Sequence, residues 1–127
     1  MISFSSTNRI VLTLCFMAML MLVSLIPGQP KPGNSAFIGL LASTPTLVQK
    51  SLHVFLYGVF ALLLVWSLDG IQSKPYRFLI AWVIAVLFGA AMEWFQTKVP
   101  GRFGTLYDVV LNTAGAALGL LVAAFIL

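Results

Sequence analysis

Long uncharged stretches of apolar residues alternate with short polar stretches along the 127 residues of the chain. A helix that crosses a bilayer needs about 20 mostly apolar residues, with a usable range of about 17–25. When the polar residues at their ends are included, four stretches reach that length: 10–27, 48–68, 77–96 and 108–127. Each is continuous rather than alternating in polarity, whereas a membrane β-barrel needs at least about eight alternating strands. The pattern therefore predicts an all-α fold, a four-transmembrane-helix bundle that forms a single domain over residues 1–127.

Prolines and glycines mark the links between these spans, because both residues interrupt helices. The longest link is the loop at 28–47, and Asp69-Gly70 and Pro100-Gly101 mark the other two. The first span follows Arg9 and is longer than the apolar region of a signal peptide, which has about 7–15 residues. No small-x-small cleavage site follows it, so we expect this span to be a retained helix.

The composition identifies the solvent of these spans, since 61% of the residues are hydrophobic and only 8% are charged. A soluble domain has about 25% charged residues, and a disordered chain combines low hydrophobicity with high net charge. Both classes are excluded, and the lipid bilayer is the expected partner. The formal net charge of +4 is spread over the links, whereas binding to nucleic acid requires a dense basic face, so we expect no nucleic-acid partner. The single cysteine, Cys15, excludes an internal disulfide.

The lysines and arginines indicate the orientation in the membrane, because cytoplasmic loops carry an excess of both. With the N-terminus inside, three cations are cytoplasmic: Arg9, Lys74 and Arg77. Four are then outside: Lys31, Lys50, Lys98 and Arg102. If Lys50 and Arg102 are held by function or by ion pairs, the remaining count is three inside against two outside. We therefore expect a multi-pass protein of the cell membrane with a cytoplasmic N-terminus.

The few ionisable residues gather at one side of the membrane in either orientation. In a chain with four spans, the first and third links lie on the same side. The start of the second span, the end of the third and the start of the fourth therefore meet there. Of the eleven residues that are Lys or Arg (seven), Asp or Glu (three) or His (one), six fall in this region: Lys50, His53, Glu93, Lys98, Arg102 and Asp108. Ionisable groups within spans are costly and are candidates for function.

Helical spacing aligns these groups with other polar residues into one stripe on each of three helices. The stripes are Lys50, His53 and Tyr57 in the second span, Glu93 and Gln96 in the third, and Asp108 and Asn112 in the fourth. The last stripe continues as Gly115-x-x-x-Gly119. That pattern is typical of close packing between membrane helices, either within one chain or between chains, so the oligomeric state stays open.

Four motifs follow one another in this region: K-x-x-H-x-x-x-Y from Lys50 to Tyr57, E-x-x-Q from Glu93, P-G-R ending at Arg102, and D-x-x-x-N-x-x-G from Asp108. In this order, over about residues 50–120, the chain resembles the VanZ-like family. The resemblance implies an integral membrane protein of bacterial type. The member that gives the family its name is associated with low-level resistance to the glycopeptide teicoplanin.

The charged residues have structural interpretations beside the functional one. Glu93 with Arg102 or Lys50, and Asp108 with the other cation, would form ion pairs that dock the third link onto the helix ends. A guanidinium also binds phosphate or carboxylate head groups, so Arg102 is equally a candidate for ligand binding. Asp108 and Thr105 can instead cap the fourth helix, where negative charge is favoured.

The remaining polar residues also have structural interpretations. His53 can shuttle protons, or it can be a structural group that forms hydrogen bonds with neighbours such as Tyr57 and Glu93. Gln96 and Asn112 are expected to form hydrogen bonds between helices. One histidine, two carboxylates and two adjacent cations do not suit a metal ion, so we expect neither a metal site nor a cofactor.

These observations favour a non-enzymatic protein of the cell envelope with a polar mouth at one membrane surface. The mouth would bind an anionic lipid head group or a glycopeptide-related ligand through eight residues: Lys50, His53, Tyr57, Glu93, Gln96, Arg102, Asp108 and Asn112. The alternative is a small membrane enzyme, in which Glu93 and His53 act as acid and base on a lipid-linked substrate and Arg102 holds its phosphate. A third possibility is a structural membrane subunit whose polar residues only order the third link.

Overall fold

The computed structural model describes residues 3–25, 46–99 and 105–127. Within these ranges the helices are α1 (Ser6–Ser24), α3 (Thr46–Ser67), α4 (Lys74–Gln96) and α5 (Leu106–Ile126). By length and composition, each of the four is long and apolar enough to cross a membrane. The predicted all-α architecture with four transmembrane helices is therefore confirmed.

The helices begin slightly earlier than the apolar pattern indicates, because polar residues form their first turns. α1 starts at Ser6, since the hydroxyl of Ser5 caps the helix by accepting a hydrogen bond of 3.2 Å from the amide of Asn8. Pro75 lies in the first turn of α4, where its missing N–H costs no helical hydrogen bond. Most of the expected loop at 28–47 lies outside the described residues.

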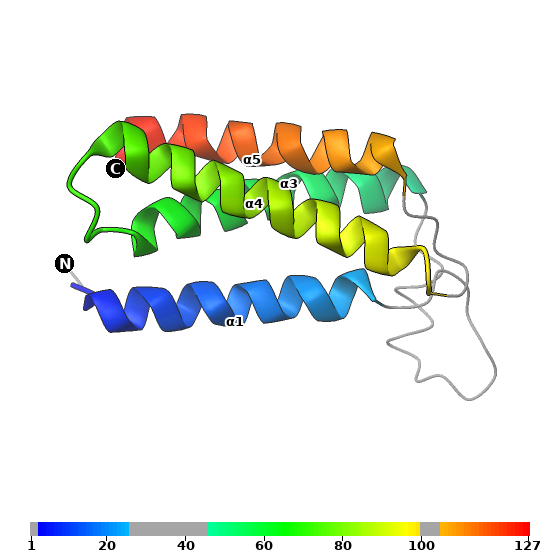
Figure 1. Ribbon diagram of the computed structural model, residues 1–127, viewed down its shortest axis with the longest axis horizontal. Coiled ribbons are helices and arrows are strands. Elements are labelled where there is room, and N and C mark those ends of the chain that lie inside the picture. Colours follow the sequence, from blue (N-terminus) through cyan, green and yellow to red (C-terminus); the bar gives the residue numbers. More distant parts are fainter. Residues whose placement is uncertain (1–2, 26–45, 100–104) are drawn as a thin grey trace.

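Figure 1 shows the helices running side by side, with the N-terminus and the C-terminus at the same end of the bundle. α3 and α4 lie between α1 and α5, which make no contact with each other among the described residues. The core is centred on α3, where the side chain of Phe60 is completely buried. Its ring stacks with Phe16 of α1 at 6.4 Å between centroids and packs against Phe88 of α4 at 5.2 Å. One apolar face of α3 thus holds two other helices.

α3 and α5 pack closely because glycines bring their backbones together. A Cβ added to Gly115 would lie 2.9 Å from Cα of Val54, and one added to Gly119 would lie 2.8 Å from Cα of Gly58. Real Cβ atoms do not approach other atoms so closely, so the two helices fit together only where these side chains are missing. The Gly115-x-x-x-Gly119 pattern packs within the chain, in the manner typical of small residues between membrane helices.

At the end of the bundle that carries both chain termini, two arginines bind the last carbonyl groups of α3. Nε of Arg77 donates a hydrogen bond of 2.6 Å to the carbonyl of Val65, and Nη1 of Arg9 donates one of 3.3 Å to the carbonyl of Trp66. Arg9 also forms an ion pair with Asp69, with 3.6 Å between Nη1 and Oδ2. Positive charge complements the negative end of the α3 dipole, so the charged residues here serve the fold.

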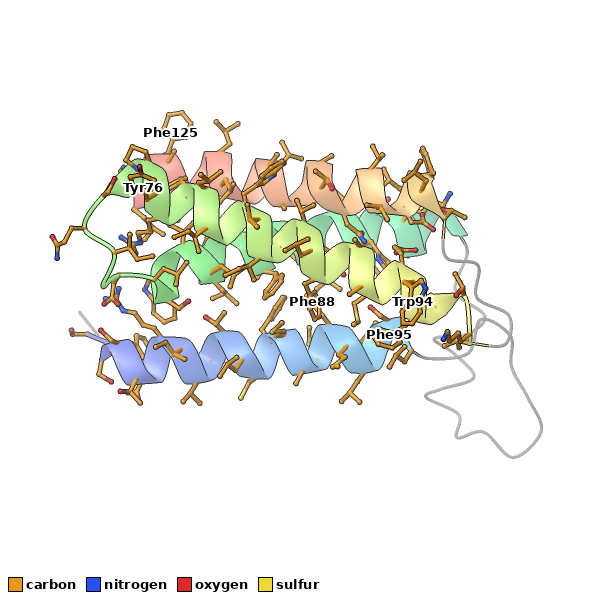
Figure 2. All side chains as sticks on the ribbon, viewed as in Figure 1. Tyr76, Phe88, Trp94, Phe95 and Phe125 are labelled. Carbon is orange, nitrogen blue, oxygen red and sulfur yellow. The ribbon has the colours of Figure 1, made fainter. Side chains whose placement is uncertain are left out.

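Exposed aromatic side chains mark both ends of the bundle. Tyr76 and Phe125 lie at the end with the chain termini, and Trp94 and Phe95 lie at the opposite end (Figure 2). Aromatic residues are enriched where membrane helices meet the water interface. Their positions are therefore those expected of a bundle whose two ends lie at the two membrane surfaces.

Candidate functional site

α1 and α4 end, and α3 and α5 begin, at the same end of the bundle (Figure 1). Four buried polar side chains lie in the half of the helices nearest this end. Glu93 and Gln96 are each 3% exposed, Asn112 is 2% exposed and Tyr57 is 1% exposed. We refer to these four residues as the polar cluster. They come from the three helices on which the sequence places polar stripes. Polar and ionisable side chains inside a membrane bundle are costly, which makes this cluster the candidate site.

The carboxylate of Glu93 is held by the side chain of Asn112, which joins α4 to α5. Nδ2 of Asn112 donates a hydrogen bond of 3.3 Å to Oε1 of Glu93. Polar side chains that form hydrogen bonds across membrane helices hold those helices together. This bond therefore fixes the carboxylate at the interface between α4 and α5.

Gly89 makes room for this arrangement one turn before Glu93 on α4. A Cβ at Gly89 would lie 3.1 Å from Cε1 of Tyr57 and 3.3 Å from Cβ of Asn112. The two side chains therefore pack directly on the backbone of α4. Gly89 is not among the site residues predicted from the sequence, although its spacing of four residues from Glu93 places both on one helix face.

Gln96 ties the polar cluster to α1. Its Nε2 donates a hydrogen bond of 3.0 Å to the backbone carbonyl of Ser24, the last residue of that helix. The carbonyl groups in the last turn of a helix have no partner within the helix, so the amide of Gln96 satisfies one of them. Ser24, which is 2% exposed, is a second residue that the sequence pattern does not reveal, because it contributes through its backbone.

His53 lies beside the cluster on α3, about one turn before Tyr57. The two rings stack with their centroids 6.3 Å apart and an interplanar angle of 15°. A cavity of about 10 Å³ lies next to them, and Ser24, His53 and Tyr57 contribute to its lining. Such a volume accommodates about one water molecule. The imidazole thus lies at the edge of the cluster, between α3 and the end of α1.

Two buried polar atoms of the cluster can take a further partner. Within the residues that the structure describes, neither the hydroxyl of Tyr57 nor Oδ1 of Asn112 has a hydrogen-bond partner. Buried polar atoms in proteins are nearly always paired, often with water or a ligand. A phenolic hydroxyl both donates and accepts, and an amide oxygen accepts. Together they suit a hydroxyl, amide or ammonium group of a bound molecule.

Lys50 and Lys98 lie outside the polar cluster, each near an aromatic ring. Nζ of Lys50 is 4.5 Å from the ring centroid of Tyr107 on α5, and Nζ of Lys98 is 4.2 Å from that of Trp94 on α4. Both are cation–π contacts. The ion pair of Lys50 with Glu93 that the sequence allows is not formed, since Lys50 has no ion pair in the described ranges.

Asp108 lies at the start of α5 and not inside the cluster. The hydroxyl of Thr105 caps the helix by accepting a hydrogen bond of 3.1 Å from the amide of Asp108, and it donates one of 2.9 Å to the carboxylate Oδ2. Asp108 also lies in the first turn, where the helix dipole favours negative charge. The geometry is that of the capping interpretation. Arg102 and the P-G-R motif lie outside the described residues.

The arrangement supplies hydrogen-bonding groups rather than a set of metal ligands. In residues 3–25, 46–99 and 105–127, no three His, Cys, Asp or Glu side chains lie close enough together to hold a metal ion. The groups at the cluster and its edge are a carboxylate, two amides, a phenol and an imidazole. All of them can form hydrogen bonds with a polar head group.

A protein-family model matches the chain over nearly its whole length. The model is described as VanZ/LLP1, and it matches residues 2–127. No curated protein and no solved structure matches the chain. The matched range includes all four helices and every residue of the polar cluster.

Proposed function

The chain belongs to the VanZ/LLP1 family, and on this premise we propose that its polar cluster binds the head group of an envelope molecule. The head group is polar or anionic and is carried by a lipid or by a glycopeptide-related ligand. In this proposal the protein is a non-enzymatic, multi-pass component of a bacterial cell membrane. Its effect on the cell is tolerance of a teicoplanin-type glycopeptide, the property associated with the member that gives the family its name.

The buried carboxylate of Glu93 is the observation that carries the proposal. Glu93 is 3% exposed in a helix that can span a membrane, and ionisable residues in such positions mark substrate and ligand sites. A purely structural contact can be made by well-packed apolar side chains at no loss of stability. The bond from Asn112 holds the carboxylate in one place, which is what recognition of a polar group requires.

A cation beside the cluster suits an anionic head group at the entrance that we propose there. Lys50 is half-buried near the start of α3, about one turn before His53. Arg102 follows α4 in the sequence and lies outside the described residues; a guanidinium is a planar fork that binds phosphate or carboxylate through two hydrogen bonds. With a cytoplasmic N-terminus, α1 crosses outward and this entrance faces the outside of the cell. A head group bound there alters the access of the glycopeptide to its target.

A small membrane enzyme is the second candidate, and the same buried carboxylate favours it. In that case Glu93 and His53 act as acid and base on a lipid-linked substrate. We prefer the binding protein to the enzyme, because Oε1 of Glu93 already accepts the hydrogen bond from Asn112. This bond joins α4 to α5.

The proposal is tested in a susceptible bacterial host that expresses the full chain or carries the empty vector. We expect the host with the chain to tolerate several-fold more teicoplanin, while the covalent structures of its envelope lipids, measured by mass spectrometry, stay unchanged. Equal tolerance in the two strains, with the chain present in the membrane at a verified level, would contradict the proposal. A new covalent lipid species would favour the enzyme over the binding protein.

A further inference from the structure

A long apolar groove of about 410 Å³ lies where α3 meets α5. Its floor is the close contact between glycine backbones, and its walls are large apolar side chains. The floor residues are Gly58, Gly115 and Gly119, and the walls include Phe55, Leu62, Leu118 and Val122. Among the described residues, Ser51 at one end is the polar member of the lining. The groove is therefore built to take an apolar occupant.

The groove has the length of one leaflet of a membrane. It follows α3 from Ser51 to Leu62, which is about 16 Å at a rise of 1.5 Å per residue. The hydrocarbon core of a bilayer is about 30 Å thick. The groove therefore runs from the membrane surface beside the polar cluster to about the middle of the bilayer, which is the path of one acyl chain in that leaflet.

Lys50 lies at the end of the groove that meets the membrane surface. It precedes Ser51 and lies one turn before Val54, which also lines the groove. Its Nζ is 4.5 Å from the ring centroid of Tyr107, so the contact joins α3 and α5, the two helices that form the groove. Because Lys50 forms no ion pair in the part of the chain that the structure describes, its charge can attract an anionic group at the groove entrance.

We propose that the groove between α3 and α5 holds one acyl chain of an anionic lipid, whose phosphate lies at Lys50. This second proposal rests on the proposed function in one respect, because it takes the head group that the protein binds to be the head group of a lipid. A second copy of the chain is the other possible occupant. A helix of a second copy crosses the whole bilayer, whereas the groove ends at Leu62 and Val122. An acyl chain matches this length, and the phosphate matches the charge of Lys50.

The test measures which lipid the full chain retains. The purified protein is equilibrated with vesicles of equal amounts of dioleoyl-phosphatidylglycerol and dioleoyl-phosphatidylcholine, and native mass spectrometry identifies the retained lipid. We expect one phosphatidylglycerol per chain, preferred several-fold over phosphatidylcholine. Lys50→Gln should remove this preference. Lys74→Gln is its matched control at the opposite end of the bundle and should keep it.

Leu118→Trp tests the groove itself, because the larger side chain fills it. Retention of phosphatidylglycerol should fall several-fold in this variant. Leu87→Trp is the matched control, since Leu87 on α4 is 64% exposed and Leu118 is 56% exposed, but Leu87 does not line the groove. Equal retention in the two variants would overturn the proposal. A dimer that disappears only in Leu118→Trp would also overturn it, in favour of a second copy.

A second measurement covers the case in which Leu118→Trp does not reach the membrane. A phosphatidylglycerol with a photoreactive acyl chain is cross-linked to the unchanged protein, and the labelled positions are mapped. Labels at Leu118 and Val122 support the groove, whereas equal labelling at Leu87 overturns it.

Retention of lipid by Glu93→Gln separates the two proposals. Normal retention in this variant, together with loss of its tolerance, would show that the groove holds lipid without the polar cluster. Normal retention by the unchanged chain, in a strain whose tolerance that chain does not raise, supports the groove and contradicts only the proposed function.

Discussion

Asn112 on α5 donates a hydrogen bond of 3.3 Å to the carboxylate of Glu93 on α4, and the two side chains are 2% and 3% exposed. Asn112 packs against the α4 backbone at Gly89, where a Cβ would lie 3.3 Å from Cβ of Asn112. The same pair therefore joins two helices and positions the most deeply buried carboxylate of the described residues. Fold and candidate site depend on each other at this contact.

Asn112→Leu should lower the free energy of unfolding by about 1–3 kcal/mol, because it leaves the buried carboxylate of Glu93 without its amide donor. Thermal unfolding in detergent measures the change. Thr113→Val is the matched control, since the hydroxyl of Thr113 donates to the carbonyl of Val109 in its own helix, at 2.8 Å. A double-mutant cycle with Glu93→Leu, which removes the acceptor oxygen, should give a coupling of about 0.6 kcal/mol, and at most about 1.7. A coupling of zero would show that the two side chains do not interact.

Gly119→Ala should destabilise the bundle, because its Cβ would collide with the carbonyl of Gly58 on α3. Forcing an extra methyl group into a packed interface costs about 1–3 kcal/mol. Gly70→Ala is the control, since a Cβ at Gly70 meets nothing within 4 Å. Both variants are compared by thermal unfolding in detergent. If they are equally stable, α3 and α5 do not approach each other as closely as the structure places them.

Arg77→Gln should lower the free energy of unfolding by about 1–2 kcal/mol, because it removes a charged donor from the C-terminal end of α3. Nε of Arg77 lies 2.6 Å from the carbonyl of Val65. Lys74→Gln is the control, since Nζ of Lys74 lies over the ring of Phe78 in its own helix, 5.8 Å from the ring centroid. Equal losses in the two variants, measured by thermal unfolding, would contradict the role of Arg77. Glycopeptide tolerance should be unaffected at equal protein levels, because these residues lie far from the polar cluster.

The four helices could be predicted from the sequence because a membrane span follows a length rule that needs no tertiary information. Their first turns could not be predicted in this way. The start of α1 at Ser6 depends on a hydrogen bond to the hydroxyl of Ser5, which a count of apolar residues does not register. Local capping therefore decided the residue at which α1 begins.

Spacing along each helix placed the four residues of the polar cluster on shared faces, but it could not predict the register between helices. Lys50 meets Tyr107 instead of a carboxylate, because close backbone contact fixes how α3 and α5 align. Gly89 and Ser24 could not be found by looking for polar side chains. Gly89 contributes the absence of a side chain, and Ser24 contributes a backbone carbonyl.

A cysteine at position 106 should react with a membrane-impermeant maleimide added to intact cells, if the polar cluster faces outward. Leu106 is 80% exposed at the start of α5, and the native Cys15, also exposed, is first replaced by alanine. Ser73→Cys, just before α4 at the opposite end, is the matched control and should react only after the membrane is opened. The reverse pattern would place the cluster in the cytoplasm and contradict an outward-facing site.

The role of the polar cluster is tested most directly by the teicoplanin tolerance of Glu93→Gln and Asp69→Asn strains, compared at equal amounts of protein in the membrane. Both variants replace a carboxylate with an amide of similar size. One change lies in the polar cluster, and the other lies at the opposite end, where Asp69 pairs with Arg9. We predict that Glu93→Gln loses most of the tolerance that the chain confers and that Asp69→Asn keeps it. Unchanged tolerance in Glu93→Gln, or an equal loss in both strains, would contradict the claim that the polar cluster binds the ligand.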